Sequence, residues 1–311
     1  MTMSIRNLKL SYILYNFFHK KKLKHNIPLY RKYGLHKQYY SSISSADFKH
    51  LDNAATRKED ISKIKESIFF QKQNNDNQES LLRYFDRGFS VVRGFISTEK
   101  ADEVNHEIER LRQNGELNFT NGNKLMFAIH KSETIKDIGL DADLMHFLDI
   151  LMDGKTKLFQ SINFINGSQQ KTHSDSIHMT TFPLGGLIGV WIALEDVDME
   201  NGALHYYPQS HRLPYYMNSD YDNEGNFWKL GEKGYEEYEK MLAEKVAELN
   251  LEKEIFTCKK GDMLIWHANI LHGGEPHIDK TRTRKSMVFH YFDMDAICYH
   301  EVSQRPALFE S

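Results

Sequence analysis

The five residues THSDS at positions 172–176 place an imidazole and a carboxylate two positions apart. On an extended strand, residues i and i+2 project from the same face, so we expect the side chains of His173 and Asp175 to point together, away from Ser174. One nitrogen and one oxygen ligand on a shared face suit a divalent metal ion and leave most of a six-coordinate shell open. A third protein ligand must then come from another part of the chain.

The segment GDMLIWHANILHGG at 261–274 supplies two candidates for the third ligand, His267 and His272. We favour His272, which ends an apolar run and is followed by Gly273 and Gly274, because glycine permits close approach of the backbone to a site. Two histidines and one carboxylate are the ligand set of non-haem Fe(II) oxygenases. The sequence therefore predicts an Fe(II) centre.

An Fe(II) centre of this kind needs a reductant for O2, and 2-oxoglutarate supplies electrons while its keto acid end chelates the iron. Its other carboxylate needs a cation. Arg284 begins the strand-like run 284–292, and arginine pairs with a carboxylate through two hydrogen bonds. Arg282 stays open as the alternative, because it would face the same way two residues earlier on a strand.

Other histidines close to these segments are expected to be ordinary surface or partly buried side chains, because an isolated histidine is more often structural than a ligand. These are His178, His205, His211 and His290.

The elements that position these residues are mainly strands. Beyond residue 156, short runs rich in Phe, Ile, Val and Tyr are broken by Gly, Pro, Asn and Asp, which is typical of a sheet-forming region. Predicted strands are 89–96, 157–165, 186–194, 203–208, 262–270 and 286–292, and predicted helices are 99–113 (capped by Ser97 or Thr98), 142–152 and 234–250.

The insertion 215–252 separates two of the predicted strands, and we expect it to act as a lid over the site. Within it, Tyr221, Phe227 and Trp228 are candidates for contact with substrate, although side chains of these types more often serve packing.

The order of these features resembles that of the phytanoyl-CoA dioxygenase family of Fe(II)- and 2-oxoglutarate-dependent oxygenases. The family pattern is H-x-D, an apolar strand containing WIAL and then an acid, NG-x-L, PGSH, GD before a distal H-G/S, and a following Arg. The chain has HSD at 173–175, VWIALEDV at 190–197, ENGALHYYPQSHR at 200–212, GDMLIWHANILHGG at 261–274 and TRTRKSMVFHYF at 281–292. The resemblance covers about residues 82–294, and Gln209 departs from the Gly of PGSH.

The resemblance implies a mainly β fold with flanking helices, the double-stranded β-helix (jelly roll, cupin-like). It implies that His173, Asp175 and His272 bind Fe(II), that Arg284 holds 2-oxoglutarate and that Trp191 lines the cosubstrate pocket. The implied reaction is hydroxylation of an unactivated carbon, with O2 as co-substrate and succinate and CO2 as co-products. Related halogenating enzymes have Ala or Gly in place of Asp175, so its presence favours hydroxylation or desaturation. Family substrates indicate a small-molecule, lipid or glycan substrate.

The sequence predicts three parts of the chain: a basic N-terminal helical arm (1–71), a polar linker (72–81) and an oxygenase domain (82–311). Residues 1–50 carry ten Lys and Arg and the single acid Asp47, although the whole chain has a net charge of -3. We expect the arm to pack on the acidic body, with peripheral membrane contact as the alternative and no nucleic-acid partner. Its apolar run is too short to span a bilayer and lacks the features of a signal peptide.

Composition sets the remaining limits. The 311 residues are 40% hydrophobic, and Cys258 and Cys298 are too few for a disulfide framework, so we expect a folded protein of a reducing, cytoplasmic compartment. Two other classes compete with the oxygenase. A catalytically silent jelly roll that binds a metal or a partner would not need the His, Asp, His and Arg set, and the ordered series with its Arg argues against a zinc hydrolase.

Overall fold

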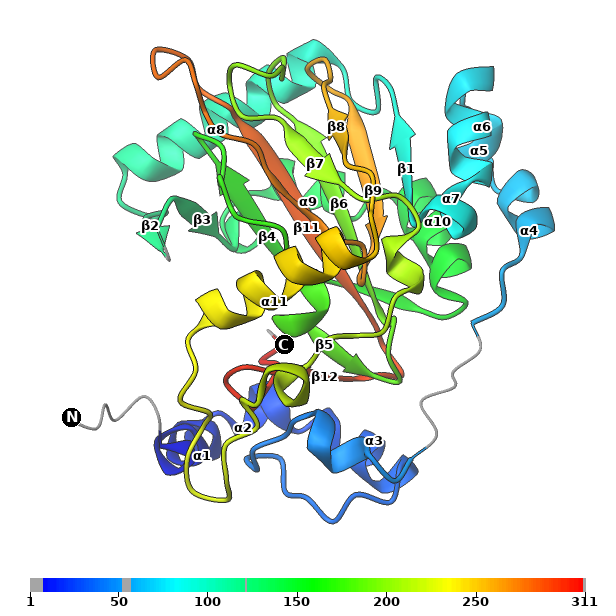
Figure 1. Cartoon of the computed structure of the whole chain (residues 1–311). Coiled ribbons are helices and arrows are strands. Elements are labelled where there is room, and N and C mark those ends of the chain that lie inside the picture. Colours follow the sequence, from blue (N-terminus) through cyan, green and yellow to red (C-terminus); the bar gives the residue numbers. More distant parts are fainter. Residues whose placement is uncertain (1–7, 52–56, 121, 310–311) are drawn as a thin grey trace.

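A seven-stranded antiparallel sheet forms the centre of the protein (Figure 1). The computed structural model describes residues 8–51, 57–120 and 122–309. The strands of this sheet, in spatial order, are β1 (Phe89–Val92), β9 (Met263–His267), β6 (Leu187–Ala193), β11 (Ser286–Asp293), β4 (Thr156–Phe164), β3 (Lys124–Met126) and β2 (Phe119–Thr120).

Two three-stranded sheets complete the β structure. The first contains β10 (His272–Gly274), β7 (Leu204–Tyr206) and β8 (Glu254–Phe256), and the second contains β13 (Arg305–Pro306), β12 (Ile297–His300) and β5 (Thr180–Phe182). The β7 sheet packs on one face of the large sheet, where Leu204, Tyr206 and Phe256 share an apolar cluster with Trp191 and Val288. Two sheets packed face to face agree with the predicted jelly roll.

Side chains along the central strands point alternately to the two faces of the large sheet. On β11, Met287, Phe289 and Tyr291 lie in the core cluster that contains the helices, whereas Val288 lies in the cluster shared with the β7 sheet. The helices on that first face include α8 (Thr98–Gln113), α9 (Glu133–Gly139) and α10 (Ala142–Met152), with η3 (Ala128–His130) directly before α9. The even-numbered residues of β11 therefore face the interior of the jelly roll.

Side-chain caps explain where the helices begin. Ser97 caps α8 by accepting the N–H of Lys100, and Asp141 caps α10 by accepting the N–H of Leu144. Each such cap satisfies a backbone donor that has no partner within the helix. The predictions of these two helices and of the main strands are confirmed within a few residues.

The prediction that 72–81 is an exposed linker is wrong. Most of this segment forms α6 (Asn75–Leu82), which Asn74 caps by accepting the N–H of Asn77, and Leu81 is completely buried. The preceding α4 (Ile61–Glu66) and α5 (Ile68–Gln71) contribute Ile64 and Phe69 to the same core, and α7 (Tyr84–Arg87) leads into β1. A single buried Leu and a capping Asn suffice for a short helix, and the polar composition of the segment concealed both.

The N-terminal helices pack at the other end of the protein, against the β12 sheet. They are α1 (Lys9–Phe18), α2 (Lys20–Leu23) and α3 (Asn26–Lys32), followed by η2 (Ser45–Phe48). The ring of Phe48 stacks on Phe182 of β5 with centroids 4.2 Å apart, and Tyr30 joins the same cluster as Tyr299. The buried carboxylate of Glu301 accepts hydrogen bonds from the backbone and hydroxyl of Ser45 at 2.8 and 2.7 Å.

The insertion 215–252 contains η6 (Asn218–Tyr221) and α11 (Tyr235–Glu248). Tyr221, Tyr238 and Leu242 pack with Ile177 and Leu271 in a small cluster of their own. Among the described residues, no helix is both long enough and apolar enough to cross a bilayer. Just before the insertion, Gln209 precedes η5 (Ser210–Arg212) with φ 65°, which explains why glycine is usual there.

Candidate active site

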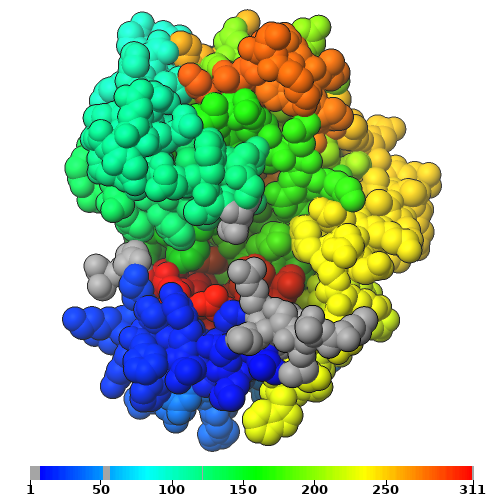
Figure 2. Space-filling view, turned by 90° about the vertical axis from the view of Figure 1, so that its left-hand side faces the viewer, coloured from blue at the N-terminus to red at the C-terminus, as the bar shows by residue number. Residues whose placement is uncertain are grey.

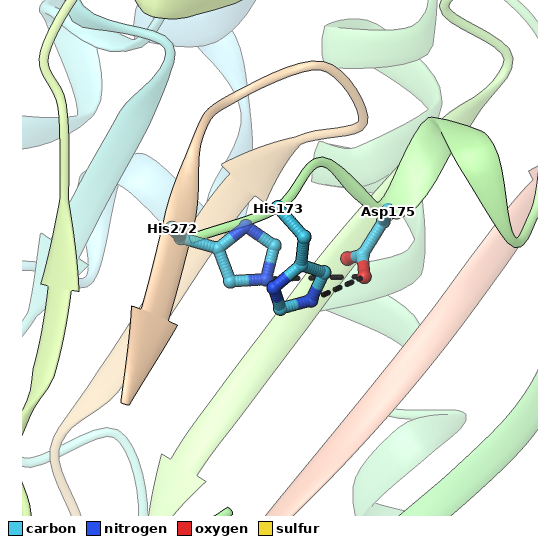
Figure 3. Close-up of side chains that lie close together, drawn as sticks. All are labelled: His173, Asp175 and His272. Carbon is cyan, nitrogen blue, oxygen red and sulfur yellow. Dashed lines mark ion pairs between the residues drawn. The ribbon is translucent and has the colours of Figure 1, made fainter. Parts of the chain in front are cut away.

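The two candidate histidine ligands lie directly opposite each other. The backbone N–H of His173 donates to the carbonyl of His272 at 2.9 Å, and the N–H of His272 donates back to the carbonyl of His173 at 2.9 Å. Their rings are 4.5 Å apart at the centroids, and Figure 3 shows both turned toward Asp175. A Cβ at Gly273 would lie 2.8 Å from the carbonyl oxygen of Gln170, so close approach of the backbone requires glycine there.

Backbone carbonyls fix which nitrogen of each ring is free. Nδ1 of His173 lies 2.9 Å from the carbonyl of Lys171, and Nδ1 of His272 lies 3.0 Å from the carbonyl of Ile270. A carbonyl only accepts, so each Nδ1 carries a proton and each Nε2 keeps a lone pair. The Nε2 atoms lie 3.9 and 3.8 Å from Oδ1 of Asp175. Three donor atoms therefore converge on one point.

Asp175 does not lie on a strand, contrary to the prediction. It begins η4 (Asp175–Ile177), in which the hydroxyl of Ser174 accepts the N–H of Ser176 at 3.1 Å and donates to the carbonyl of Ala268. Serine and aspartate favour such turns because their side chains bond to nearby backbone. His272 likewise begins β10 and does not end the apolar run, because β9 stops at His267.

The protonation states suit a metal ion. Burial, followed by the neighbouring His272, lowers the pKa of His173 to about 3. Burial raises the pKa of the Asp175 carboxyl, but the surrounding histidines outweigh this effect and hold that pKa well below its usual value. At neutral pH His173 is thus a neutral imidazole and Asp175 a carboxylate, the forms that bind a metal without first losing a proton.

A cavity of about 660 Å³ contains this cluster. Its walls include residues from β3, β4, β6 and β11, and Ser303 and residues 305–308 line it as well. Figure 2 shows a hollow in the face of the protein between residues around 120 (green) and the N-terminal helices (blue), with C-terminal residues (red) inside it. None of the described residues that line the cavity comes from 215–252, so the lid stays a prediction.

Two histidines that were expected to be bystanders line the cavity. His290 on β11 has its Nε2 3.5 Å from Oδ2 of Asp175, and the ring of His178 is 6.3 Å from that of His173. The even position of His290 on β11 is the sequence signal that could have placed it inside. His205 instead lies behind β10, between Thr172 and Glu275, at 2.9 and 2.7 Å from their oxygens.

The three candidates for substrate contact are absent from the described cavity lining. Tyr221 is buried and donates to the side chain of Asn218 at 2.9 Å, which is a packing role. Phe227 and Trp228 are 80% and 65% exposed, and their rings contact each other with centroids 4.8 Å apart.

Arg284 and Arg282 have different surroundings. Arg284 is 1% exposed and lines the cavity, where it bonds to the hydroxyl of Ser286 at 2.6 Å, and its Nε has no partner among the described residues. Burial lowers its pKa to about 10, so it remains a cation at neutral pH. Arg282 is paired with Asp198 at 2.9 Å outside the cavity. A buried guanidinium without a carboxylate fits a site for an added anion.

Trp191 and Lys124 complete the lining on this side. The guanidinium of Arg284 lies 5.6 Å from the ring of Trp191, whose buried Nε1 also has no partner among the described residues. Lys124 on β3 was not identified from the sequence; it lines the cavity, and burial lowers its pKa. Among the described residues, His267 is not part of the group that could hold a metal ion, which is His173, Asp175 and His272.

The sequence profile described as Phytanoyl-CoA dioxygenase (PhyH) matches residues 84–285, well over half of the chain. The chain belongs to this family. Phytanoyl-CoA dioxygenase domain-containing protein 1 of Danio rerio is 23% identical over 188 residues, covering 43% of this chain and 65% of that protein, so just under two thirds of its length is spanned. The Dictyostelium discoideum homolog is 23% identical over 274 residues, covering 70% of this chain and 92% of that protein.

Solved structures show the same fold. The non-heme alpha ketoglutarate dependent carbocyclase SnoK is 15% identical with a TM-score of 0.61, covering 78% of this chain and 95% of that one. EctD from S. alaskensis with 2-oxoglutarate and 5-hydroxyectoine is 16% identical with a TM-score of 0.53, covering 71% and 79%. The predicted jelly roll is confirmed. The predicted cofactors, iron and 2-oxoglutarate, agree with the donor set of the triad and with the crystal of the epimerase SnoN, which contains Fe3+ and alpha ketoglutarate.

Proposed function

We propose that the protein is an Fe(II)- and 2-oxoglutarate-dependent dioxygenase that hydroxylates an unactivated carbon of a small-molecule, lipid or glycan substrate. One observation carries the proposal. The triad of His173, Asp175 and His272 shares its cavity with the buried guanidinium of Arg284, which has no carboxylate at ion-pair distance among the described residues. A metal site and an anion site in one cavity are what a chelating dicarboxylate requires.

The triad would hold Fe(II) through Nε2 of both histidines and Oδ1 of Asp175. Bound iron with 2-oxoglutarate supplies the oxidant: O2, 2-oxoglutarate and substrate C–H give succinate, CO2 and C–OH. The backbone carbonyls that hold both Nδ1–H groups keep the imidazoles oriented before the metal arrives. Asp175 occupies the third protein position, so a halide has no vacant place there, which supports hydroxylation over halogenation.

Arg284 would hold the distal carboxylate of 2-oxoglutarate. Ser286 fixes one end of its guanidinium, and the unpaired Nε leaves donor capacity directed at an incoming carboxylate. Trp191 would line the same pocket, with an indole N–H that also lacks a partner. Arg282 is excluded from this role in our proposal because its charge is already paired with Asp198.

A silent scaffold is the competing function, and Arg284 argues against it. A buried cation without a counter-ion destabilises the fold, and a well-packed apolar residue would serve a scaffold better. Among the described residues, Nε of Arg284 and Nε1 of Trp191 have no hydrogen-bond partner, and an anion bound between them in the cavity would supply one to both.

An anaerobic titration tests the proposal. Fe(II) and then 2-oxoglutarate are added to the purified protein, and the visible charge-transfer band of the chelated keto acid is recorded. We expect the band in the wild type and in His106→Ala, an exposed position on α8, and its loss in His272→Ala. A well-folded wild type without a band would contradict the oxygenase and favour the scaffold.

A further inference from the structure

We propose that the end of the cavity at Arg305 binds a negatively charged group of the substrate, a carboxylate or a phosphate. This inference rests on the proposed function and adds to it a substrate class. It concerns a cation separate from Arg284, in the C-terminal segment that lines the cavity.

Arg305 is held in place without being neutralised. It pairs through the backbone with His300 in the β12–β13 hairpin, and its guanidinium lies 4.8 and 5.0 Å from the rings of Tyr12 and Tyr15 on α1. Within the part of the chain that the structure describes, no carboxylate lies at ion-pair distance from it. A guanidinium stacked on aromatic rings keeps its N–H edge free for an oxyanion.

Strand β11 shows that Arg305 and Arg284 serve different ends of the cavity. Arg284, Val288, His290 and Phe292 all line it, in this order along the strand. Eight residues of strand from 284 to 292 span roughly 27 Å, with His290 beside the metal triad between them. Phe292 packs on Phe309 at 6.0 Å, next to the segment that carries Arg305. The metal site therefore lies between two cations.

The lining between the metal and Arg305 suits an organic substrate with one charged end. A line of imidazoles leads outward, with ring centroids 6.3 Å apart from His173 to His178 and 5.4 Å from His178 to His300. Phe159, Met179 and Phe292 supply an apolar wall beside it. Burial and then the charge of Arg305 lower the pKa of His300 to about 4, so this ring stays neutral and Arg305 carries the charge.

Calorimetric titration with two anionic probes tests the subsite. Inorganic phosphate and octanoate are titrated separately into the full chain, first without metal and then anaerobically with Fe(II) and 2-oxoglutarate, so that Arg284 is occupied in the second state. We expect at least one probe to bind in both states, with affinity reduced at least about tenfold in Arg305→Gln and partly restored in Arg305→Lys. Arg282→Gln, at a half-buried arginine that is paired with Asp198 outside the cavity, is the matched control and leaves the affinity unchanged.

Each outcome either identifies the anion that binds at Arg305 or contradicts the proposed subsite. Binding of phosphate alone identifies a phosphate ester, and binding of octanoate alone identifies a carboxylic acid. A wild type that binds neither probe, or an Arg305→Gln protein that binds as tightly, overturns the inference while a normal charge-transfer band leaves the proposed function intact. A missing band with Arg305-dependent binding in the metal-free chain removes the proposed function and keeps the anion site.

A second, independent observation concerns the surface, from which we infer that α1 and residues 227–228 dock on an anionic lipid surface. Leu10, Leu14, Phe17 and Phe18 are 61%, 59%, 52% and 74% exposed. At 100° per residue these four positions fall within one stripe about 100° wide on the helix. The opposite side of α1 carries Asn16, which is completely buried against the body.

Phe227 and Trp228 extend this apolar stripe from a distant part of the sequence. The N–H of Lys9 donates to the carbonyl of Trp228 at 3.0 Å, and Leu8 pairs with Lys229, so the loop lies beside the start of α1. Figure 1 also shows the loop that precedes α11 (yellow) passing beside α1. Two segments thus expose their large apolar side chains together, which a monomer in water does not favour.

The charges beside the stripe determine the partner. Lys20, Lys21 and Lys24 are exposed immediately after Phe18, and Asp47 is the only acid in residues 1–50. Apolar and aromatic side chains beside a cluster of lysines match an interface with negatively charged headgroups better than they match a second copy of the same basic surface.

Sedimentation with vesicles tests this docking. The wild type is expected to pellet with phosphatidylcholine vesicles that contain phosphatidylglycerol, and to pellet less with phosphatidylcholine alone or at high salt. Phe18→Ser with Trp228→Ser, and separately Lys20→Glu with Lys21→Glu, should abolish pelleting, whereas Ile278→Ser, at a 67% exposed position on another surface, should not. Wild type that stays in solution, or variants that still pellet, overturn the inference. So does concentration-dependent dimerisation that the same variants remove, because a second copy then covers the surface.

Discussion

Trp266 Nε1 donates a hydrogen bond of 2.8 Å to Oδ2 of Asp175, so one oxygen of the carboxylate is held by β9 while the other faces the histidines. A metal-ligating carboxylate that can rotate freely loses part of its binding energy to the entropy of being ordered. The indole removes this freedom, and its ring also lies 5.1 Å from the ring of His272. Trp266 is therefore a positioning residue for two of the three candidate ligands.

Trp266→Phe is expected to weaken Fe(II) binding by about 10- to 100-fold, the usual effect of losing a partner behind a metal ligand. The change is measured by adding Fe(II) anaerobically to the protein with 2-oxoglutarate and recording the charge-transfer band at each Fe(II) concentration. Trp228→Phe is the control, because Trp228 is exposed and is not among the described residues that line the cavity. An unchanged affinity in Trp266→Phe would show that the hydrogen bond does not orient Asp175.

Gly189→Ala is expected to displace the same indole by a different route. A Cβ at Gly189 would lie 2.3 Å from Cε2 of Trp266 and 2.5 Å from its Nε1, distances that the rigid ring cannot accommodate in place. Overpacking of this kind costs about 1–3 kcal/mol of unfolding free energy. Urea unfolding should show that loss together with weaker Fe(II) binding. Gly154→Ala, whose added Cβ would stay 3.3 Å from its nearest neighbour, serves as control.

Arg284→Gln is expected to raise the dissociation constant of 2-oxoglutarate by about 10- to 100-fold, which corresponds to about 1.5–3 kcal/mol for hydrogen bonds to a charged group. Arg282→Gln should leave it unchanged, because that arginine is paired with Asp198. The comparison uses calorimetry on the protein loaded with Mn(II), which binds without oxidation. Equal losses in both variants would contradict the assignment of Arg284.

The convergence of His173, Asp175 and His272 as a candidate metal triad could be predicted from the sequence, because metal chemistry restricts the side chains that can serve as ligands. Their local structure could not. An H-x-D pair predicts one strand face, but the capping hydroxyl of Ser174 turns the chain at Asp175, and the ligands converge through the pairing of His173 with His272.

The sequence did not predict that Arg305 and His290 line the cavity, because their positions depend on contacts between segments far apart in the chain. The C-terminal segment with Arg305 lines it only because α1 and the β12 sheet hold that segment in place. His290 was identified as a bystander because a lone histidine in an apolar strand is usually structural, and only the register of β11 with its neighbours directs it toward Asp175. The helix α6 was missed because its polar residues outnumber Leu81 and Leu82, the two leucines that pack it against the core.

Stability is expected to fall between pH 6.5 and 5, in part through His267. Burial, followed by the charges of His211 and Arg57, lowers the pKa of His267 to about 3, and its Nδ1 accepts the N–H of Asn269 at 3.1 Å, which requires an unprotonated nitrogen.

The sign of this effect follows from the direction of the shift. A lowered pKa means that the unfolded chain binds a proton below pH 6.5 while the folded chain does not, so acid favours unfolding, by up to about 2 kcal/mol over 1.5 pH units. In His267→Gln the loss of unfolding free energy from pH 7.5 to pH 5 should be smaller than in wild type by up to this amount, whereas His106→Gln at an exposed position should follow wild type. Urea midpoints at both pH values measure the difference. Parallel pH dependence in His267→Gln and wild type would show that His267 is protonated in the folded state, and the hydrogen bond from Asn269 would then have to break on acidification.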